Sequence, residues 1–316
     1  MSVNLVAYCA SELGVSPQVI RRIGLQAPHK YKRFKIRKRS GGEYRDVAQP
    51  AREVKALQRA LVSFLKSSCQ IHEAATAYVS GGSIAKNAQP HLGSRYLLKL
   101  DFTKFFDSID IDDVVEFLSN TLGDRASKSE VELAARAFCW QSSPGTKLAL
   151  CIGAPSSPFL SNAIMAPFDR VIASECEARK VTYTRYSDDM TFGALHREAL
   201  IDVERLVVEM CSGMTHPTLR LNPEKRVLVG RASRLWVTGV CLSTQGELTV
   251  GRVRKRGIRA GVKRFLNGEL SEAAILKLRG EIAFASSVET QFLDRLYDWY
   301  GSRVSLLLSK KGREAK

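Results

Sequence analysis

Apolar residues recur along the chain with two periods, one typical of amphipathic helices and one typical of strands. Residues 50–68 follow the helical spacing, with apolar side chains at Val54, Leu57, Leu61 and Leu65. Residues 29–50 instead alternate on both sides of a Ser-Gly-Gly turn signal, which predicts a hairpin rich in lysine and arginine. Residues 3–24 predict helical structure, with a second short helix starting at Ser16-Pro17.

The middle of the chain alternates between strand and helix patterns. The apolar run Tyr96–Leu100 predicts a buried strand that ends at Asp101, and two helices are expected after it. Residues 153–180 open with a Gly-Ala-Pro loop and then predict one long helix. Residues 181–193 predict a strand, a turn and a second strand, and short strands follow within residues 218–250.

The C-terminal part, residues 252–316, is basic and helical in pattern. Seven positive charges occur between residues 252 and 264 with no acidic residue among them. A solvated helix face is the ordinary explanation for such a run, but contact with phosphates fits this density of charge better. With strands in the middle and helices on both sides, the fold class is predicted to be α+β.

The charge balance of the whole chain points to a polyanionic partner. Lysine and arginine number 48 against 32 aspartates and glutamates, which gives a formal net charge of +16. Nucleic acid is the first candidate for the partner and an anionic membrane surface is the second. No apolar run approaches the length of a membrane span, so we expect no membrane insertion.

The seven cysteines are scattered singly, and none forms a Cys-x-x-Cys pair. This spacing argues against a zinc ribbon and against a disulfide framework. Isolated cysteines in odd number fit a reducing cytoplasm, and the N-terminal residues lack the pattern of a secretory signal. We therefore expect a cytoplasmic protein.

Two adjacent aspartates, Asp188 and Asp189, occupy the turn predicted within residues 181–193. Neighbouring like charges raise each other's pKa and cost energy when partly buried, so a solvated surface turn is the simplest reading. However, Asp101 ends another predicted strand, and if the strands are neighbours three carboxylates converge at one sheet edge. Such a cluster requires cations, and Mg²⁺ prefers carboxylates, phosphates and waters as ligands. The pattern therefore predicts a site with two Mg²⁺ ions for phosphoryl transfer.

Six short motifs occur in a fixed order around these aspartates. They are Asn-Ala-Gln-Pro-His (87–91), Asp-Phe-Thr-Lys-Phe-Phe (101–106), Gly-Ala-Pro-Ser-Ser-Pro (153–158), Tyr-Ser-Asp-Asp (186–189), Asn-Pro-Glu-Lys (222–225) and Val-Thr-Gly (237–239). In this order the chain resembles a bacterial reverse transcriptase over about residues 30–300. The first and last motifs make it similar to the retron reverse transcriptases in particular.

The resemblance implies a right-hand polymerase with fingers, an antiparallel-sheet palm and a helical thumb. It divides the chain into an N-terminal region with fingers (1–93), a palm with interleaved fingers helices (94–244) and a basic helical thumb (245–316). The family's reaction is RNA-templated DNA synthesis from deoxynucleoside triphosphates, with two Mg²⁺ ions as cofactors.

The motif positions imply roles for individual residues. Asp101, Asp188 and Asp189 would be catalytic metal ligands, and Lys225 would act as a general acid toward the departing pyrophosphate. The residues implied to bind the nucleotide are Lys38, Arg45, Phe106, Gly153 and Ser156. Phe106 would exclude the ribose 2′-OH sterically. The residues implied to contact RNA are Asn87, His91, Val237, Thr238, Gly239, Arg254, Lys255 and Arg256.

Each of these residues also has an ordinary structural explanation. Lys38 and Arg45 fit solvated hairpin charges, Phe106 fits a core aromatic, and Lys225 fits a surface lysine. Three positions depart from the family pattern: Ile152 replaces the usual glutamine, Ser187 replaces alanine or valine, and Arg226 replaces threonine. None of these departures removes a predicted metal ligand, but with Ile152 a polar contact to template or nucleotide is either missing or supplied by another residue.

Similarity to retrons implies a partner noncoding RNA that serves as template and primer. Synthesis would start from an RNA 2′-OH and yield a branched RNA–DNA hybrid, msDNA, within an antiphage system that has a separate effector protein. Two alternatives remain at this stage. One is a reverse transcriptase of the group II intron or diversity-generating kind, and the other is a noncatalytic RNA-binding module on a polymerase fold.

Overall fold

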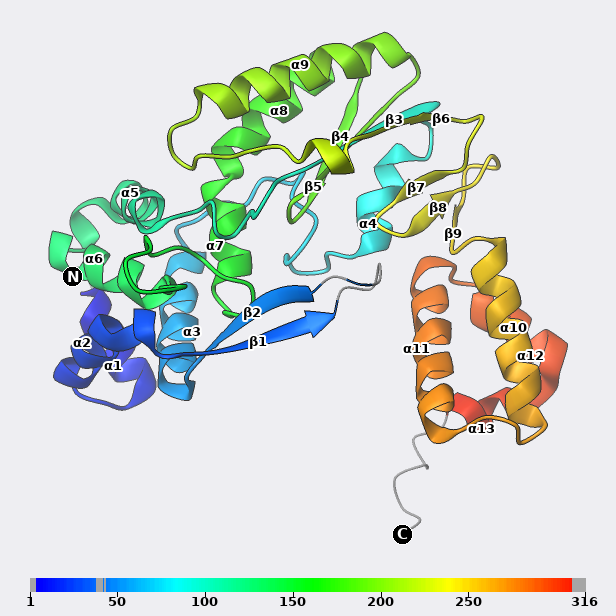
Figure 1. Ribbon diagram of the computed structural model, residues 1–316, viewed down its shortest axis with the longest axis horizontal. Coiled ribbons are helices and arrows are strands. Elements are labelled where there is room, and N and C mark those ends of the chain that lie inside the picture. Colours follow the sequence, from blue (N-terminus) through cyan, green and yellow to red (C-terminus); the bar gives the residue numbers. More distant parts are fainter. Residues whose placement is uncertain (1–3, 38–41, 43, 309–316) are drawn as a thin grey trace.

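The computed structural model describes residues 4–37, 42 and 44–308, and the predicted nucleotide ligand Lys38 lies outside these residues. These described residues form three antiparallel sheets with helices around them (Figure 1). This arrangement confirms the predicted mixture of helices with antiparallel strands. Among the described residues, no helix is both long and apolar enough to cross a membrane.

The N-terminal part consists of helices that flank a two-stranded hairpin. Its elements are α1 (Leu5–Leu13), α2 (Pro17–Gln26), β1 (Tyr31–Arg37), β2 (Tyr44–Pro50) and α3 (Arg52–Lys66). The break between α1 and α2 lies at Gly14, which takes a left-handed backbone conformation with φ +63° that glycine adopts readily. Strands β1 and β2 pair from Tyr31–Pro50 to Arg37–Tyr44, which confirms the predicted hairpin.

A four-stranded antiparallel sheet forms the centre of the molecule, in the order β4-β5-β3-β6. Its strands are β3 (Tyr96–Asp101), β4 (Thr182–Tyr186), β5 (Asp189–Ala194) and β6 (Val227–Gly230). Strand β3 is central, and its apolar residues Leu97, Leu98 and Leu100 are almost completely buried. The strands predicted to carry the aspartates are therefore neighbours, with β3 paired to β5.

The helices of this part of the chain pack on both faces of the sheet and against one another. They are α4 (Ile84–Ala88), α5 (Ile111–Leu122), α6 (Lys128–Phe138), α7 (Ser157–Ile164), α8 (Ala166–Ala178) and α9 (Arg197–Gly213). Figure 1 shows α8 and α9 side by side, and they contact β4 and β5 respectively. The prediction of one long helix after the Gly-Ala-Pro loop was wrong. Pro167 lacks the N–H that would continue the helix, so α7 ends and α8 begins at Met165.

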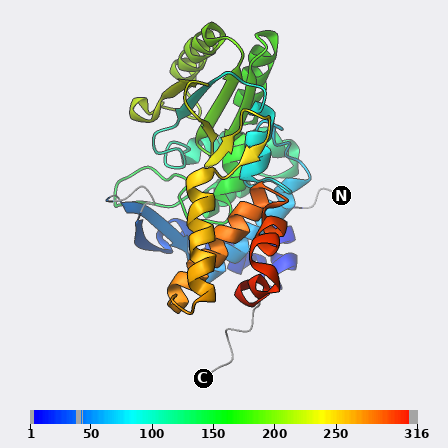
Figure 2. The same cartoon turned by 90° about the vertical axis from the view of Figure 1, so that its right-hand side faces the viewer.

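The C-terminal part has a hydrophobic core of its own, which includes residues from Leu235 to Leu307. Its elements are β7 (Leu235–Val237), β8 (Val240–Leu242), β9 (Leu248–Thr249), α10 (Arg252–Leu266), α11 (Glu272–Val288), α12 (Phe292–Tyr300) and α13 (Val304–Leu308). Figure 2 shows these helices grouped below the β7–β9 strands. Ala88 and Leu97 also belong to this core and connect it to the central sheet.

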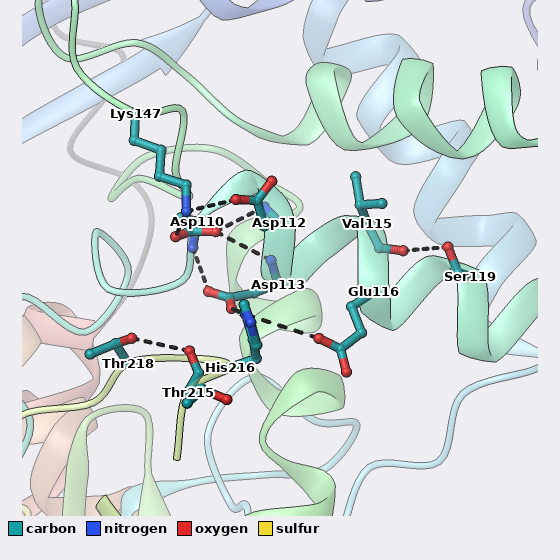
Figure 3. A network of polar contacts seen from close by, with 10 residues as sticks. All are labelled: Asp110, Asp112, Asp113, Val115, Glu116, Ser119, Lys147, Thr215, His216 and Thr218. Atoms are coloured by element: carbon teal, nitrogen blue, oxygen red, sulfur yellow. Dashed lines mark hydrogen bonds and ion pairs between the residues drawn. The ribbon is translucent and has the colours of Figure 1, made fainter. Parts of the chain in front are cut away.

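A polar network fixes the start of α5 and the loop that follows α9 (Figure 3). Asp110 caps α5 by accepting the backbone N–H of Asp112 at 2.8 Å, and Lys147 forms ion pairs with both side chains. Asp113, almost fully buried, lies 3.0 Å from Nδ1 of His216. The loop of His216 continues to Asn222, whose N–H donates to the carbonyl of Asp101 at 2.8 Å. The network thus anchors the segment that adjoins Asp101.

The contact with Asp113 raises the pKa of His216 above its ordinary value. A protonated His216 then stabilises the fold fully at pH values below about 6.5, and this stabilisation is lost as the pH rises through the raised pKa. Burial raises the pKa of Asp113, although its hydrogen bond with His216 acts in the opposite direction. The pH dependence tested below is therefore the titration of His216.

We expect His216→Gln to lower the thermal unfolding midpoint near pH 6 and to have little effect near pH 9. The control is His196→Gln, at an exposed histidine before α9. Thermal unfolding of both variants across this pH range checks the prediction. A His216→Gln deficit that is the same at both pH values would contradict it.

Candidate active site

Three aspartates meet at one end of the central sheet. Asp101 ends β3 and stands opposite Asp189, the first residue of β5, in the antiparallel register. Asp188 lies in the turn between β4 and β5, and its carbonyl accepts the N–H of Phe102 at 3.2 Å. One carboxylate oxygen from each aspartate lies within 4.8 Å of the other two. The structure thus confirms the convergence predicted from the strand pattern.

The cluster is electrostatically crowded. Burial and then repulsion from Asp101 raise the pKa of Asp188. Asp189 stays accessible to water, but partial desolvation, its hydrogen bond with Asp101 and the nearby charges raise its pKa to about 7. These raised pKa values indicate that too little positive charge lies near the two carboxylates to stabilise their ionised forms. A divalent cation would supply that charge, so the donor set fits a metal site.

Lys225 makes a direct ion pair with this cluster. Its Nζ donates to both oxygens of the buried Asp101 carboxylate, at 2.7 and 2.9 Å. Burial alone would lower the pKa of Lys225, but the hydrogen bond to Asp101 and the negative charges of the three aspartates together outweigh burial and raise the pKa. The lysine reaches this position because Asn222 caps the short turn at Pro223–Lys225 with a 3.1 Å bond to the N–H of Glu224. Lys225 therefore remains protonated beside the aspartates, as a proton donor must be.

The structure describes four of the predicted nucleotide-binding residues, Arg45, Phe106, Gly153 and Ser156, and Arg45 lies near the cluster. Arg45, on β2, is close enough to Asp188 to lower its pKa partially. Phe106 is partly buried, and its ring centroid lies 5.5 Å from that of Phe105. Gly153 has φ +114° and lies against β2, where a Cβ would approach the Ala48 carbonyl to 2.7 Å. Only glycine fits this position without displacing the hairpin.

The loop that contains Gly153 is also bound to the hairpin through its backbone. The carbonyl of Ile152 accepts the N–H of Ala48 at 2.8 Å. Ser156 is completely buried, and its hydroxyl has no hydrogen-bond partner among the described residues. Ser156 is therefore packed inside the loop. Ile152 joins the loop to the hairpin through its backbone carbonyl.

A buried ion pair braces the aspartate turn, and sequence reasoning did not identify it. Arg185 and Asp169 are both fully inaccessible, and Arg185 Nε donates to Asp169 Oδ1 at 2.8 Å. The same guanidinium donates to Asn162 at 3.1 Å and to the carbonyl of Ser187 at 3.0 Å. Ser187 has φ +63°, a strained value for serine. The only sequence signal was an arginine inside a strand pattern, with its acidic partner on a distant helix.

Asn87 and His91, predicted to contact RNA, are both fully buried. Asn87 accepts from Thr76 at 2.7 Å and donates to Thr238 Oγ1 at 3.3 Å. His91 Nε2 lies 2.9 Å from Thr184 Oγ1, and burial lowers the pKa of its ring to about 4. Any effect of these two side chains on RNA would therefore pass through the segments they connect.

The Val-Thr-Gly motif forms the tight turn between β7 and β8. Val237 is buried and pairs with Val240, while Thr238 and Gly239 both have positive φ values, +46° and +82°. Gly239 has open space where a Cβ would stand, so its backbone is accessible at the turn. The motif therefore presents backbone to the exterior and anchors Thr238 on the Asn87 side chain.

The three basic residues singled out on α10 differ in their surroundings. Lys255 is half-buried and donates to Glu289 at 2.9 Å. Arg254 pairs with Glu281 at 3.1 Å and stacks over Phe284 at 4.4 Å from the ring centre. Arg256 is exposed, and no ion pair is recorded for it among the described residues. Only Arg256 of the three is free to meet an external phosphate without giving up an internal partner.

Removal of one partner of the buried Arg185–Asp169 pair should strongly destabilise the fold. We expect Arg185→Leu to lower the free energy of unfolding by about 3–5 kcal/mol, because it leaves a buried carboxylate unpaired. Arg179→Leu breaks an exposed pair with Glu175 on α8 and should cost less than about 1 kcal/mol. Urea unfolding of the two variants checks the prediction, and equal costs would contradict it.

Comparisons with known proteins agree with this geometry. The family model for reverse transcriptase (RNA-dependent DNA polymerase) matches residues 36–250. The Retron Ec83 reverse transcriptase of Escherichia coli is 40% identical over 283 residues, which cover 89% of this chain and 90% of that protein. The Retron Mx65 reverse transcriptase of Myxococcus xanthus is 33% identical over 304 residues, covering 91% of this chain and 69% of that protein.

A solved foamy viral protease-reverse transcriptase in complex with double-stranded DNA is 11% identical, with a TM-score of 0.46, covering 88% of this chain and 42% of that one. The family assignment therefore rests on the family model and on the retron relatives. The chain belongs to the reverse transcriptase family and, within it, to the retron reverse transcriptases, and it is an RNA-directed DNA polymerase.

Proposed function

We propose that this polymerase copies a cognate noncoding RNA into msDNA, a branched RNA–DNA hybrid whose synthesis starts from an RNA 2′-OH. The observation that carries the proposal is the cluster of Asp101, Asp188 and Asp189 at adjacent strand ends in a chain 40% identical to a retron reverse transcriptase. A role in antiphage defence with a separate effector protein, in the cytoplasm, belongs to the same proposal.

In this proposal the three aspartates hold two Mg²⁺ ions. The ions, when bound, would lower the pKa of the attacking hydroxyl and neutralise the triphosphate. Asp101 is the least accessible ligand and its position is fixed by β3, whereas Asp188 and Asp189 come from the braced turn. Lys225 stands beside Asp101, where it would donate a proton to the departing pyrophosphate.

The nucleotide would lie between the aspartates and the β1–β2 hairpin. Arg45 would contact its triphosphate, together with Lys38. Gly153 and Ser156 would shape the loop beneath it, and Phe106 would crowd a ribose 2′-OH. The first strand pair then corresponds to fingers, the four-stranded sheet to the palm and α10–α13 to the thumb, with the proposed divisions at residues 1–93, 94–244 and 245–316.

The RNA would meet two kinds of surface. The exposed positive charges of α10 would hold phosphates of any RNA through counterion release. Recognition of one RNA requires contacts with its folded shape or unpaired bases. The turn at Val237–Gly239, anchored by Asn87 and supported by the segment that contains His91, is the proposed selective contact.

The metal assignment is tested with isosteric neutral variants. We expect Asp101→Asn and Asp188→Asn each to reduce primer extension by more than about a thousandfold, since several kcal/mol of transition-state stabilisation are lost. Equilibrium RNA binding should change little, because the basic surfaces keep their charges. The control is Glu204→Gln, which breaks an ion pair with Arg226 outside the cluster. Near-normal extension by either aspartate variant would refute the assignment.

The two RNA surfaces should separate in a side-by-side assay. We expect Arg256→Gln to weaken binding of cognate and unrelated RNA alike and to flatten the salt dependence of both. Thr238→Val should instead reduce initiation on the cognate RNA and spare extension of a generic annealed primer. Lys255→Gln serves as the matched control, because its charge already pairs with Glu289. Equal losses on both templates for Thr238→Val would remove the selective role of the turn.

A further inference from the structure

A segment outside the motifs described so far, residues 74–82, lies beside the strand that leads into the aspartate turn. The N–H of Arg185 donates to the carbonyl of Ala74 at 2.7 Å, and the N–H of Thr76 donates to the carbonyl of Arg185 at 2.9 Å. These bonds form a parallel bridge between Ala75 and Arg185. The two segments therefore run in the same direction. Tyr78 follows Ala75 by three residues, just as Asp188, in the turn after β4, follows Arg185.

Tyr78 has an unusual conformation for a bulky residue. Its φ is +61°, in the left-handed region that favours glycine. The residue is 53% exposed, and no hydrogen bond or aromatic contact is recorded for its side chain among the described residues. A large ring that makes no hydrogen bond or aromatic contact among the described residues is thus partly open to solvent near the aspartate turn.

The surrounding chain fixes this conformation from both sides. Asn162 Nδ2 donates to the carbonyl of Ala77 at 2.8 Å, and Asn162 also accepts from Arg185 of the buried network. On the other side, Gly82 closes the turn so tightly that a Cβ there would lie 2.4 Å from the carbonyl of Thr76. Strained residues persist where their surroundings over-determine them, and such residues cluster at ligand sites.

The neighbourhood of Tyr78 is suited to a flat, uncharged group. Tyr186 ends β4 on the side of the aspartate turn, and the parallel bridge between Ala75 and Arg185 leads the chain toward Tyr78 in the same direction. A residue that binds phosphate usually carries a positive charge, whereas Tyr78 is neutral and offers the flat face of its ring for stacking. Nucleobases stack on exposed aromatic rings with little regard for sequence, and they are the flat groups that a nucleic acid brings to this site.

We propose that Tyr78 is a stacking residue for a nucleobase of the nucleic acid bound beside the Asp101–Asp188–Asp189 cluster. The inference rests on the proposed function, since it requires template and primer to occupy that site. Two sources offer the same chemistry: the terminal base of the primer and the first unpaired base of the template.

The test compares Tyr78→Gly with Tyr78→Phe in the full chain. Glycine adopts positive φ without strain and removes the ring, whereas phenylalanine keeps the ring and removes only the hydroxyl. Binding is measured for a blunt RNA–DNA hybrid, the same hybrid with a template overhang, and single-stranded RNA. Lys180→Gly, at the opposite end of β4 with φ +56°, is the control for relief of backbone strain.

We expect Tyr78→Gly to bind at least one hybrid about tenfold more weakly, while its thermal midpoint stays equal or rises. Tyr78→Phe should bind as the unaltered protein does, and Lys180→Gly should raise the midpoint without a change in affinity. Weaker binding of the blunt hybrid identifies the primer terminus as the source of the base. Weaker binding of the overhang hybrid alone identifies the template.

Two results would overturn the proposal. One is unchanged affinity of Tyr78→Gly for all three nucleic acids, and the other is a lower thermal midpoint, which would show that the ring packs within the fold. Failure of the unaltered protein to extend any primer would instead count against the proposed function. The binding comparison is made without extension, so the two failures are distinguishable.

Discussion

Repulsion among three carboxylates is the constraint on which the rest of the structure depends. Asp101, Asp188 and Asp189 are brought within ligand distance of one another by the β3–β5 register and by a two-residue turn. The raised pKa values of Asp188 and Asp189 indicate that the fold alone does not neutralise the cluster. The protein holds the cluster together with hydrogen bonds from its backbone, one lysine and a rigid sheet, and leaves the remaining negative charge for cations to balance.

The rigidity comes from buried polar groups behind the sheet. The guanidinium of Arg185 contacts Asp169, Asn162 and the carbonyl of Ser187, so one side chain connects α8, α7 and the strained turn. Removing one member of such a network leaves buried groups without partners, which makes the arrangement all-or-none. The network can therefore fix the direction of the aspartates more tightly than apolar packing would. Apolar contacts are not directional, whereas each of these hydrogen bonds specifies a geometry.

Much of this could be predicted from local patterns, because those patterns report periodicity and turns. The hairpin at residues 29–50, the buried strand ending at Asp101 and the strand pair around Asp188 all follow from alternation and turn chemistry. The break between α7 and α8 was missed, although Pro167 was visible, because a helical pattern continues on both sides of it. Motif position also suggested RNA contact for Asn87 and His91, yet both side chains are buried.

The partners of buried polar groups were beyond sequence reasoning. Asp169 and Arg185 are 16 residues apart and lie on different elements, so no local spacing predicts their ion pair. The same holds for the charges on α10, where composition shows a dense positive run but not which members are already paired. Lys255 is committed to Glu289, whereas Arg256 is exposed. Net charge therefore predicts the class of partner, and only the fold decides which charges can reach it. The +16 chain thus keeps its acidic cluster and its basic helix α10 on different elements, each held by contacts that suit its own charge.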